Sequence, residues 1–273
     1  MSYIAHYDSP DLGFISAQTR EALKYIIIGR GSLGESFFET VVRQAELGTL
    51  VDSYDPDHWT VRNCQNTIGL TWSAAEYGSK KGHKDYLSTD PGQEPKVDEN
   101  TVFIVATDNL ASRSQAFDYW VESASPLLID MRSSKDLIRV ISHSSCEYEP
   151  DSHEMLRWLY PEGAQLEQAE RENDEGSCSM RGSMMHTLTA VSLASQHLFR
   201  WLQNKHKGFC MQDYAPWTGH SSCIHTGYNE VNEEDLIDFS NTYNERVNGR
   251  PFDFRFRTTR AAQSTQEAAE ALL

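Results

Sequence analysis

A glycine-rich turn between an apolar strand and a helix is the feature that most constrains how this chain can fold. The run Lys24-Tyr-Ile-Ile-Ile-Gly29 is short, apolar and stopped by glycine, which is typical of a buried parallel strand. It continues into Gly29-Arg-Gly31-Ser-Leu-Gly34, and the helix-like segment Glu35 to Leu47 then ends at Gly48. In this context the first glycine permits a tight turn, the second lets the backbone approach a phosphate, and the third lets helix and strand pack closely. The pattern predicts a βαβ unit with a phosphate site at the start of the helix.

Further strands and helices alternate along the chain, which is typical of an α/β fold. We expect a mostly parallel sheet with helices on both faces, formed by one domain that spans residues 1–273. Segment 165–183 is rich in charged and small residues and is predicted to be a crossover loop, and segment 207–273 is predicted to be a mixed C-terminal extension. The remaining predicted elements are strands at 49–55, 101–106, 126–130, 137–142 and near 254–258, helices at 73–86, 110–123 and 184–203, and a tail or terminal helix at 264–273.

Composition and charge exclude several classes of function. The formal net charge is −16, so a broad basic face that binds nucleic acid is not expected. The N-terminal sequence lacks a basic start followed by an apolar core, and no aliphatic run is long enough to span a bilayer. The five cysteines are spread too widely for a disulfide framework. We therefore expect a cytoplasmic protein without a membrane or nucleic-acid partner, which leaves basic proteins and small ligands as partners.

Acidic residues follow the second predicted strand where a ribose-binding acid is expected, roughly 20 residues beyond the glycine turn. Asp52, Asp55 and Asp57 all lie in that window, and a carboxylate there can accept hydrogen bonds from ribose hydroxyls. Since both nicotinamide cofactors and ATP contain ribose, these residues predict a nucleotide site without choosing between them.

Three further motifs resemble those of the ThiF family, the ubiquitin-activating-enzyme-like adenylyltransferases. The stretch from Asp55 to Asn63 resembles the family's Asp-x-Asp, apolar residue and Asn segment. Thr107-Asp108-Asn109, followed by Arg113, resembles its Thr-Asp-Asn…Arg segment. Glu175-Gly-Ser-Cys178, followed by Ser183 and an amphipathic helix, resembles the crossover-loop cysteine of single-domain members. With the glycine turn, the resemblance covers residues 20 to 205 and implies a Rossmann-like fold.

The resemblance implies an activity and a partner. Family members use ATP and Mg²⁺ to adenylate a carboxylate, usually the C-terminal glycine of a ubiquitin-like protein. They form homodimers with one pocket per subunit. The resemblance thus implies that this chain adenylates the C-terminus of a ubiquitin-like protein or another small protein or peptide.

The resemblance also implies roles for individual residues. Asp55 would hold the ribose, Lys80 or Lys81 would approach the phosphates, and Asp108 would hold Mg²⁺, which prefers oxygen ligands. The catalytic residues implied are Asp108, Lys81 and Cys178, and the last would accept the acyl group as a thioester. Nucleotide contacts are implied for Gly29, Gly31, Gly34, Asp55, Asp57, Asn63, Lys80 and Asn109.

Two of these assignments have alternatives. Cys178 lies in a polar loop before a predicted helix, which favours a thiolate, but Asp174 and Glu175 oppose one, and an incidental exposed thiol is the alternative. For Asp108 and Asn109, the alternative is an ordinary turn at a strand end.

The chain departs from the family pattern at the phosphate-facing arginine. The family's Asn-x-x-Arg-Gln is replaced by Asn63-Cys-Gln-Asn66-Thr67, so one positive charge is missing, and Arg30 or Arg62 would have to substitute for it. A nucleotide-binding scaffold that has lost catalysis therefore stays an alternative function, and an NAD-dependent oxidoreductase is a weaker one.

The zinc-binding CxxC pairs of many family members are also absent from this sequence. Cys210, His220, Cys223 and His225 form another possible zinc set, because Zn²⁺ accepts mixed Cys and His ligands, although their spacing matches no established pattern.

Overall fold

The computed structural model describes most of the sheet and the helices packed on it. The predicted helix at 73–86, most of the crossover loop and the segments near 254–258 and 264–273 lie outside the described residues. The described residues are 15–59, 61–68, 70, 96–123, 125–134, 137–144, 159–164, 166–167, 184–203, 208–216 and 218–226.

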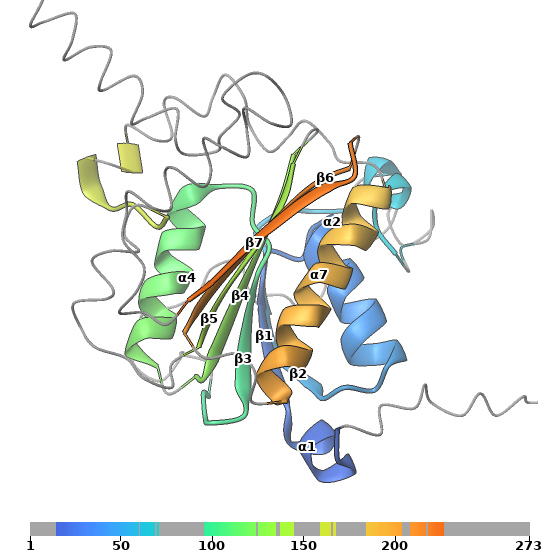
Figure 1. Ribbon diagram of the computed structural model, residues 1–273, viewed down its shortest axis with the longest axis vertical. Coiled ribbons are helices and arrows are strands. Elements are labelled where there is room, and N and C mark those ends of the chain that lie inside the picture. The colour runs from blue at the N-terminus through green and yellow to red at the C-terminus, as the bar shows by residue number, and fades with distance from the viewer. Residues whose placement is uncertain are drawn as a thin grey trace, which may run out of the picture.

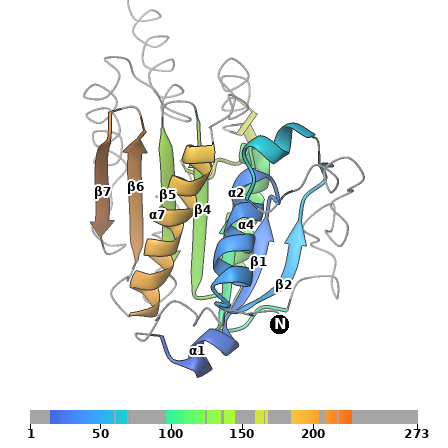
Figure 2. The same ribbon diagram turned by 90° about the vertical axis from the view of Figure 1, so that its right-hand side faces the viewer.

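A seven-stranded sheet forms the centre of the described structure (Figure 2). Its strand order is β2-β1-β3-β4-β5-β6-β7. Strands β1 to β4 pair in parallel, and β5, β6 and β7 continue the sheet in antiparallel fashion. The predicted α/β class is confirmed. The strands are β1 (Lys24–Ile28), β2 (Thr49–Tyr54), β3 (Thr101–Val105), β4 (Leu127–Ser133), β5 (Ile138–Ser144), β6 (Phe209–Ala215) and β7 (His220–Thr226).

Helices cover both faces of this sheet, as the sequence predicts. Helix α4 (Leu110–Glu122) lies on one face, while α2 (Ser32–Phe37), the π-helical turn η1 (Phe38–Gln44) and α7 (Met184–Leu202) lie on the other (Figure 1). Two clusters of buried apolar side chains fill the spaces between the helices and the sheet. The short helix α1 (Ala17–Ala22) precedes β1. Within the described ranges, no helix combines the length and the apolarity needed to cross a membrane.

The structure corrects the extent of several predicted elements. The helix after the glycine turn begins at Ser32 instead of Glu35 and continues as the π-helical η1. Strands β4 and β5 reach Ser133 and Ser144, beyond the predicted ends at 130 and 142. The mixed extension predicted after residue 207 contains two strands, β6 and β7, whose positions the sequence analysis does not predict.

A buried ion pair joins β5 to β6 within the antiparallel half. Arg139 on β5 lies directly opposite Asp213 on β6, and its Nε and Nη2 each donate to one carboxylate oxygen at 2.7 Å. Both side chains are almost completely buried, so the two-pronged geometry is needed to offset the loss of hydration. These charges interrupt the apolar pattern of both strands.

Candidate functional site

The carboxyl ends of β1, β2 and β3 meet where the strand order of the sheet reverses. From β1 the chain goes to β2 on one side and then to β3 on the other, and open α/β sheets bind ligands at such a switch point. The Gly29 amide donates to the Tyr54 carbonyl at 2.8 Å, and the Ala106 amide donates to the Ile28 carbonyl at 2.7 Å. The structure therefore brings the glycine turn beside the segments that carry Asp55 and Asp108.

The three glycines of the turn have different surroundings. Gly29 has φ +89°, and a Cβ there would lie 2.7 Å from the backbone of Ala106 and Thr107. A Cβ at Gly34 would lie 1.9 Å from the Gly29 carbonyl oxygen, so α2 can pack on β1 only with glycine at this position. Gly31, the N-cap residue of α2, would place a Cβ in open space, with no atom within 4 Å. Packing within the protein thus requires Gly29 and Gly34, whereas Gly31 leaves room for an approaching ligand.

Of the three acids in the ribose window, Asp55 lies at the strand end. It is buried beside the glycine turn, and its Oδ1 accepts a hydrogen bond from the Asp57 amide at 2.9 Å. Asp57 itself is exposed. Asp52 lies within β2, where its carboxylate accepts from the Tyr54 hydroxyl at 2.9 Å and from the Ser53 amide at 3.0 Å. Asp55 is therefore the best placed of the three to face a ligand at the switch point.

Asp108 and Asn109 form an exposed turn between β3 and α4. Asn109 is the N-cap of α4, since its side-chain oxygen accepts from the Ser112 amide at 2.7 Å. Its backbone carbonyl accepts from the Thr107 hydroxyl at 3.1 Å. The capping role gives Asn109 a structural function, while the adjacent Asp108 presents an exposed carboxylate next to the switch point.

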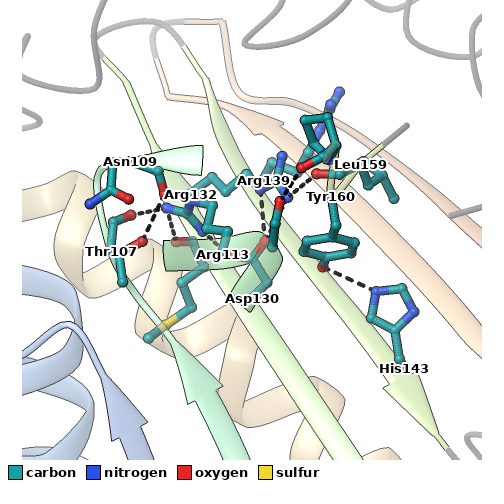
Figure 3. A network of polar contacts seen from close by, with 12 residues as sticks. Thr107, Asn109, Arg113, Asp130, Arg132, Arg139, His143, Leu159 and Tyr160 are labelled. Carbon is teal, nitrogen blue, oxygen red and sulfur yellow. Dashed lines mark hydrogen bonds and ion pairs between the residues drawn. The ribbon is translucent and has the colours of Figure 1, made fainter. Parts of the chain in front are cut away.

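A buried network of charges lies behind this turn (Figure 3). Arg113 on α4 donates to the Thr107 carbonyl and to one carboxylate oxygen of Asp130 on β4. Arg132 donates to the other oxygen of Asp130, with Nε at 2.8 Å and Nη2 at 2.7 Å. All three side chains are at most 3 % exposed. Asp130 thus joins two guanidinium groups, and one of them fixes the backbone immediately before Asp108.

Sequence reasoning singled out Arg113 as part of a motif but missed Asp130 and Arg132. The only signal is that charged residues interrupt the apolar stretch Leu127–Ser133, which is otherwise a buried strand.

The stretch that contains Asn63 packs against the start of α2. The Thr67 hydroxyl donates to Ser32 Oγ at 3.1 Å, and the Ile68 amide donates to Ser36 Oγ at 2.9 Å. The Asn66 amide donates to the Asn63 carbonyl at 3.1 Å, so both residues belong to one turn next to the glycine turn. Asn66, which stands where the family has arginine, therefore lies on a segment attached to the predicted site.

Arg30 is directed along α2 and is paired with an acid. Its Nε donates to Glu35 Oε2 at 2.7 Å, and its guanidinium lies over the Phe38 ring at 4.2 Å from the ring centroid. Glu35 also contacts Nη2, whereas the buried Nη1 has no hydrogen-bond partner among the described residues. Because Glu35 neutralises most of this charge, Arg30 is a poor substitute for the missing arginine.

Several predicted residues cannot be placed. Lys80, Lys81 and Cys178 lie outside the described residues. Of the possible zinc set, Cys210 and Cys223 lie together, and the side chains of His220 and His225 are outside the description. Among the residues that the structure describes, no group of three or more His, Cys, Asp or Glu side chains could hold a metal ion.

The described geometry defines an α/β protein with a glycine turn and two acids at the switch point of its sheet. Comparison with protein-family models gives no match, and no curated protein matches the chain. Solved structures of MccB share its fold.

Three of these structures illustrate the similarity. Escherichia coli MccB with ATP has a TM-score of 0.54 at 10% identity, over 77% of this chain and 66% of that chain. E. coli MccB with MccA-N7isoASN has a TM-score of 0.56 at 11% identity, over 79% of this chain and 68% of that chain. The microcin C7 biosynthetic enzyme MccB in complex with N-formylated MccA has a TM-score of 0.54 at 13% identity, over 79% of this chain and 68% of that chain.

These values show that the chain shares the fold of MccB, which agrees with the Rossmann-like fold that the sequence resemblance implies. The chain spans slightly less than two thirds of the length of the MccB chain solved with ATP.

Proposed function

We propose that this protein uses ATP to adenylate the C-terminal carboxylate of a peptide or small protein. The observation that carries this proposal is that the glycine turn, with its open Gly31 backbone, and the strand end that leads to the exposed Asp108 meet at the switch point of the sheet. The shared fold supports it, because MccB has been solved with ATP and in complex with its peptide MccA.

The residues at the switch point suit a nucleoside triphosphate. The backbone at Gly31 would face the phosphates, and the buried carboxylate of Asp55 would accept hydrogen bonds from the ribose. The Asp108 carboxylate would hold Mg²⁺, a hard ion that binds oxygen ligands and would offset the negative charge of the phosphates. In this reaction the acceptor carboxylate attacks the α-phosphorus, and the products are an acyl-adenylate and pyrophosphate. The protein contributes mainly orientation and charge stabilisation.

A short peptide is the first acceptor to test, since MccB has been solved in complex with N-formylated MccA. The ThiF resemblance adds a ubiquitin-like protein as a second acceptor and a homodimer as the assembly. It also assigns Cys178 as the thiol that would take the acyl group from the adenylate as a thioester. Lys80 or Lys81 would supply positive charge at the phosphates, and the reaction would take place in the cytoplasm.

ATP–pyrophosphate exchange in the presence of candidate acceptors tests the proposal. We expect exchange that depends on the free C-terminus of the acceptor. The variant Asp108→Asn should lose this exchange, because an amide lacks the negative charge with which the carboxylate would bind Mg²⁺. Glu122→Gln is the matched control, because Glu122 is an exposed acid at the far end of α4. Full exchange by Asp108→Asn would contradict the metal assignment, and Cys178→Ala should keep exchange while losing any thiol-labile conjugate.

A nucleotide-binding scaffold without catalysis is the second candidate. Two observations favour it: Asn66 replaces the family arginine, and Glu35 neutralises Arg30. If it is correct, ATP binds in calorimetry while no acceptor supports exchange. In that case Asn66→Arg, which restores the missing charge on the segment beside the glycine turn, should produce measurable exchange.

A further inference from the structure

Two thiols lie together on β6 and β7, away from the glycine turn. Cys210 Sγ is 3.6 Å from Cys223 Sγ, and the two residues lie diagonally across the strand pair, because Cys223 pairs with Gln212. Cys210 is buried and Cys223 is exposed. Strand β7 is the last strand of the described sheet, so the exposed residue Cys223 lies at the sheet edge and Cys210 lies one strand further in.

The surroundings of the pair favour a thiolate at the exposed position. The hydrogen bond between the two sulfurs, together with Arg200 of α7, lowers the pKa of Cys223 to about 6, against opposing contributions from burial and from Asp213. The same hydrogen bond and burial raise the pKa of Cys210, so that residue keeps its proton. On the far side of Cys210, His197 Nε2 lies 3.9 Å from its sulfur. The negative charge of the pair is therefore placed on Cys223.

This arrangement has the features of a reactive thiol with a resolving partner. Such cysteines are exposed, stabilised as thiolates by a nearby cation, and placed next to a second thiol. Cys64 provides a contrast within the same chain, since among the described residues it has no hydrogen bond to a second sulfur. The difference between the two environments predicts site-selective chemistry.

We propose that Cys223 and Cys210 form a dithiol site that reacts with hydroperoxides. The Cys223 sulfur attacks one peroxide oxygen, the O–O bond breaks, and the leaving oxygen takes a proton as water or alcohol, which leaves a sulfenic acid on Cys223. The Cys210 sulfur then attacks the Cys223 sulfur. The sulfenic hydroxyl leaves with the Cys210 proton as water, and a disulfide forms. Two electrons pass from the two thiols to the peroxide.

The first test uses the reduced, full-length chain without substitutions. Limiting isotope-labelled iodoacetamide is applied from pH 5 to 9, and each cysteine is quantified by mass spectrometry. We expect Cys223 alkylation to have its midpoint near pH 6. At pH 6.5, Cys223 should react about five-fold faster than Cys64, after allowing for the lower nucleophilicity of a more acidic thiol. A Cys223 midpoint at or above pH 8 would overturn the proposal.

The second test follows the oxidation product. Stoichiometric hydrogen peroxide should link the peptides that contain Cys210 and Cys223, and a dithiol reductant should reverse the link. Cys210→Ser should instead give a sulfenic acid on Cys223 that dimedone traps, while Cys64→Ser, the matched control, should form the link normally. Absence of the linked peptide from the oxidised native chain would refute the resolving role. ATP–pyrophosphate exchange uses the other site, so the two proposals can fail independently.

Discussion

At the scale of single residues, Arg113 links the turn that carries Asp108 to the sheet. Its guanidinium contacts the Thr107 carbonyl, the Asp130 carboxylate and, at 3.3 Å, the Met131 carbonyl. Asp130 is completely buried and also binds Arg132, so each buried charge in this network depends on the others for neutralisation. Removing one partner of a buried ion pair leaves an uncompensated charge, which is more costly than the net value of the pair.

We therefore expect Arg113→Met to lower the free energy of unfolding by about 3 kcal/mol, measured by urea denaturation. Arg43→Met is the control, since the Arg43 side chain is more than half exposed in its ion pair with Glu39 on η1, and its loss should leave the midpoint nearly unchanged. Because Arg113 fixes the backbone before Asp108, the folded variant should also lose pyrophosphate exchange. Equal urea midpoints for Arg113→Met and the unsubstituted chain would show that the network is not stabilising.

Lys24 at the start of β1 and Asp98 just before β3 form an ion pair, which predicts that the stability of the fold depends on pH. The hydrogen bond from Lys24 lowers the pKa of Asp98, and bonds from the Thr101 hydroxyl and the Asn100 amide act in the same direction. A carboxyl group whose pKa is lower in the folded state adds stability above its unfolded pKa, and this stability is lost as pH falls through the folded value. Both side chains are 40% exposed, so the contribution is below about 1 kcal/mol.

Asp98→Asn should thus be slightly less stable than the original chain at pH 7, and the difference should vanish toward pH 2. Thermal unfolding across this pH range measures it. A difference that grows as the solution is acidified would contradict the sign of the linkage.

At the scale of elements, the contact between β1 and α2 decides the shape of the glycine turn. Gly34 touches the Gly29 carbonyl so closely that any side chain must push the helix away, whereas Gly31 faces open space. Gly34→Ala should cost about 3 kcal/mol of stability through overpacking. Gly31→Ala should cost less than about 1 kcal/mol, as expected at an N-cap, yet weaken ATP binding. Calorimetry with ATP and urea unfolding of both variants measure the two effects, and tight ATP binding by Gly31→Ala would argue against phosphate contact there.

The same elements show what the sequence can predict. The apolar run of β1, the glycine turn and the acids after β2 and β3 are local patterns, and parallel strands carry their ends to one edge of the sheet. Their meeting at the switch point was therefore predictable. Strands β6 and β7 were not, because Asp213 in β6 is compatible with burial only through Arg139 on a distant segment. The roles of Asp130 and Arg132 were not predicted for the same reason. A buried charge can be recognised only when the group that neutralises it is known.

At the scale of the whole molecule, a ligand that binds only the folded state stabilises all of it. MgATP at 100 times its dissociation constant should raise the free energy of unfolding by about 2.7 kcal/mol, which is measurable as a rise in melting temperature. NAD at the same concentration should give no rise, and this separates adenylation and scaffold functions from an oxidoreductase. EDTA should reduce the rise in melting temperature that MgATP causes in the unsubstituted chain. In Asp108→Asn the melting temperature with ATP should not respond to EDTA, because the substitution has already removed the metal contact that EDTA removes. A melting temperature that responds to NAD and not to MgATP would show that the glycine turn binds a dinucleotide.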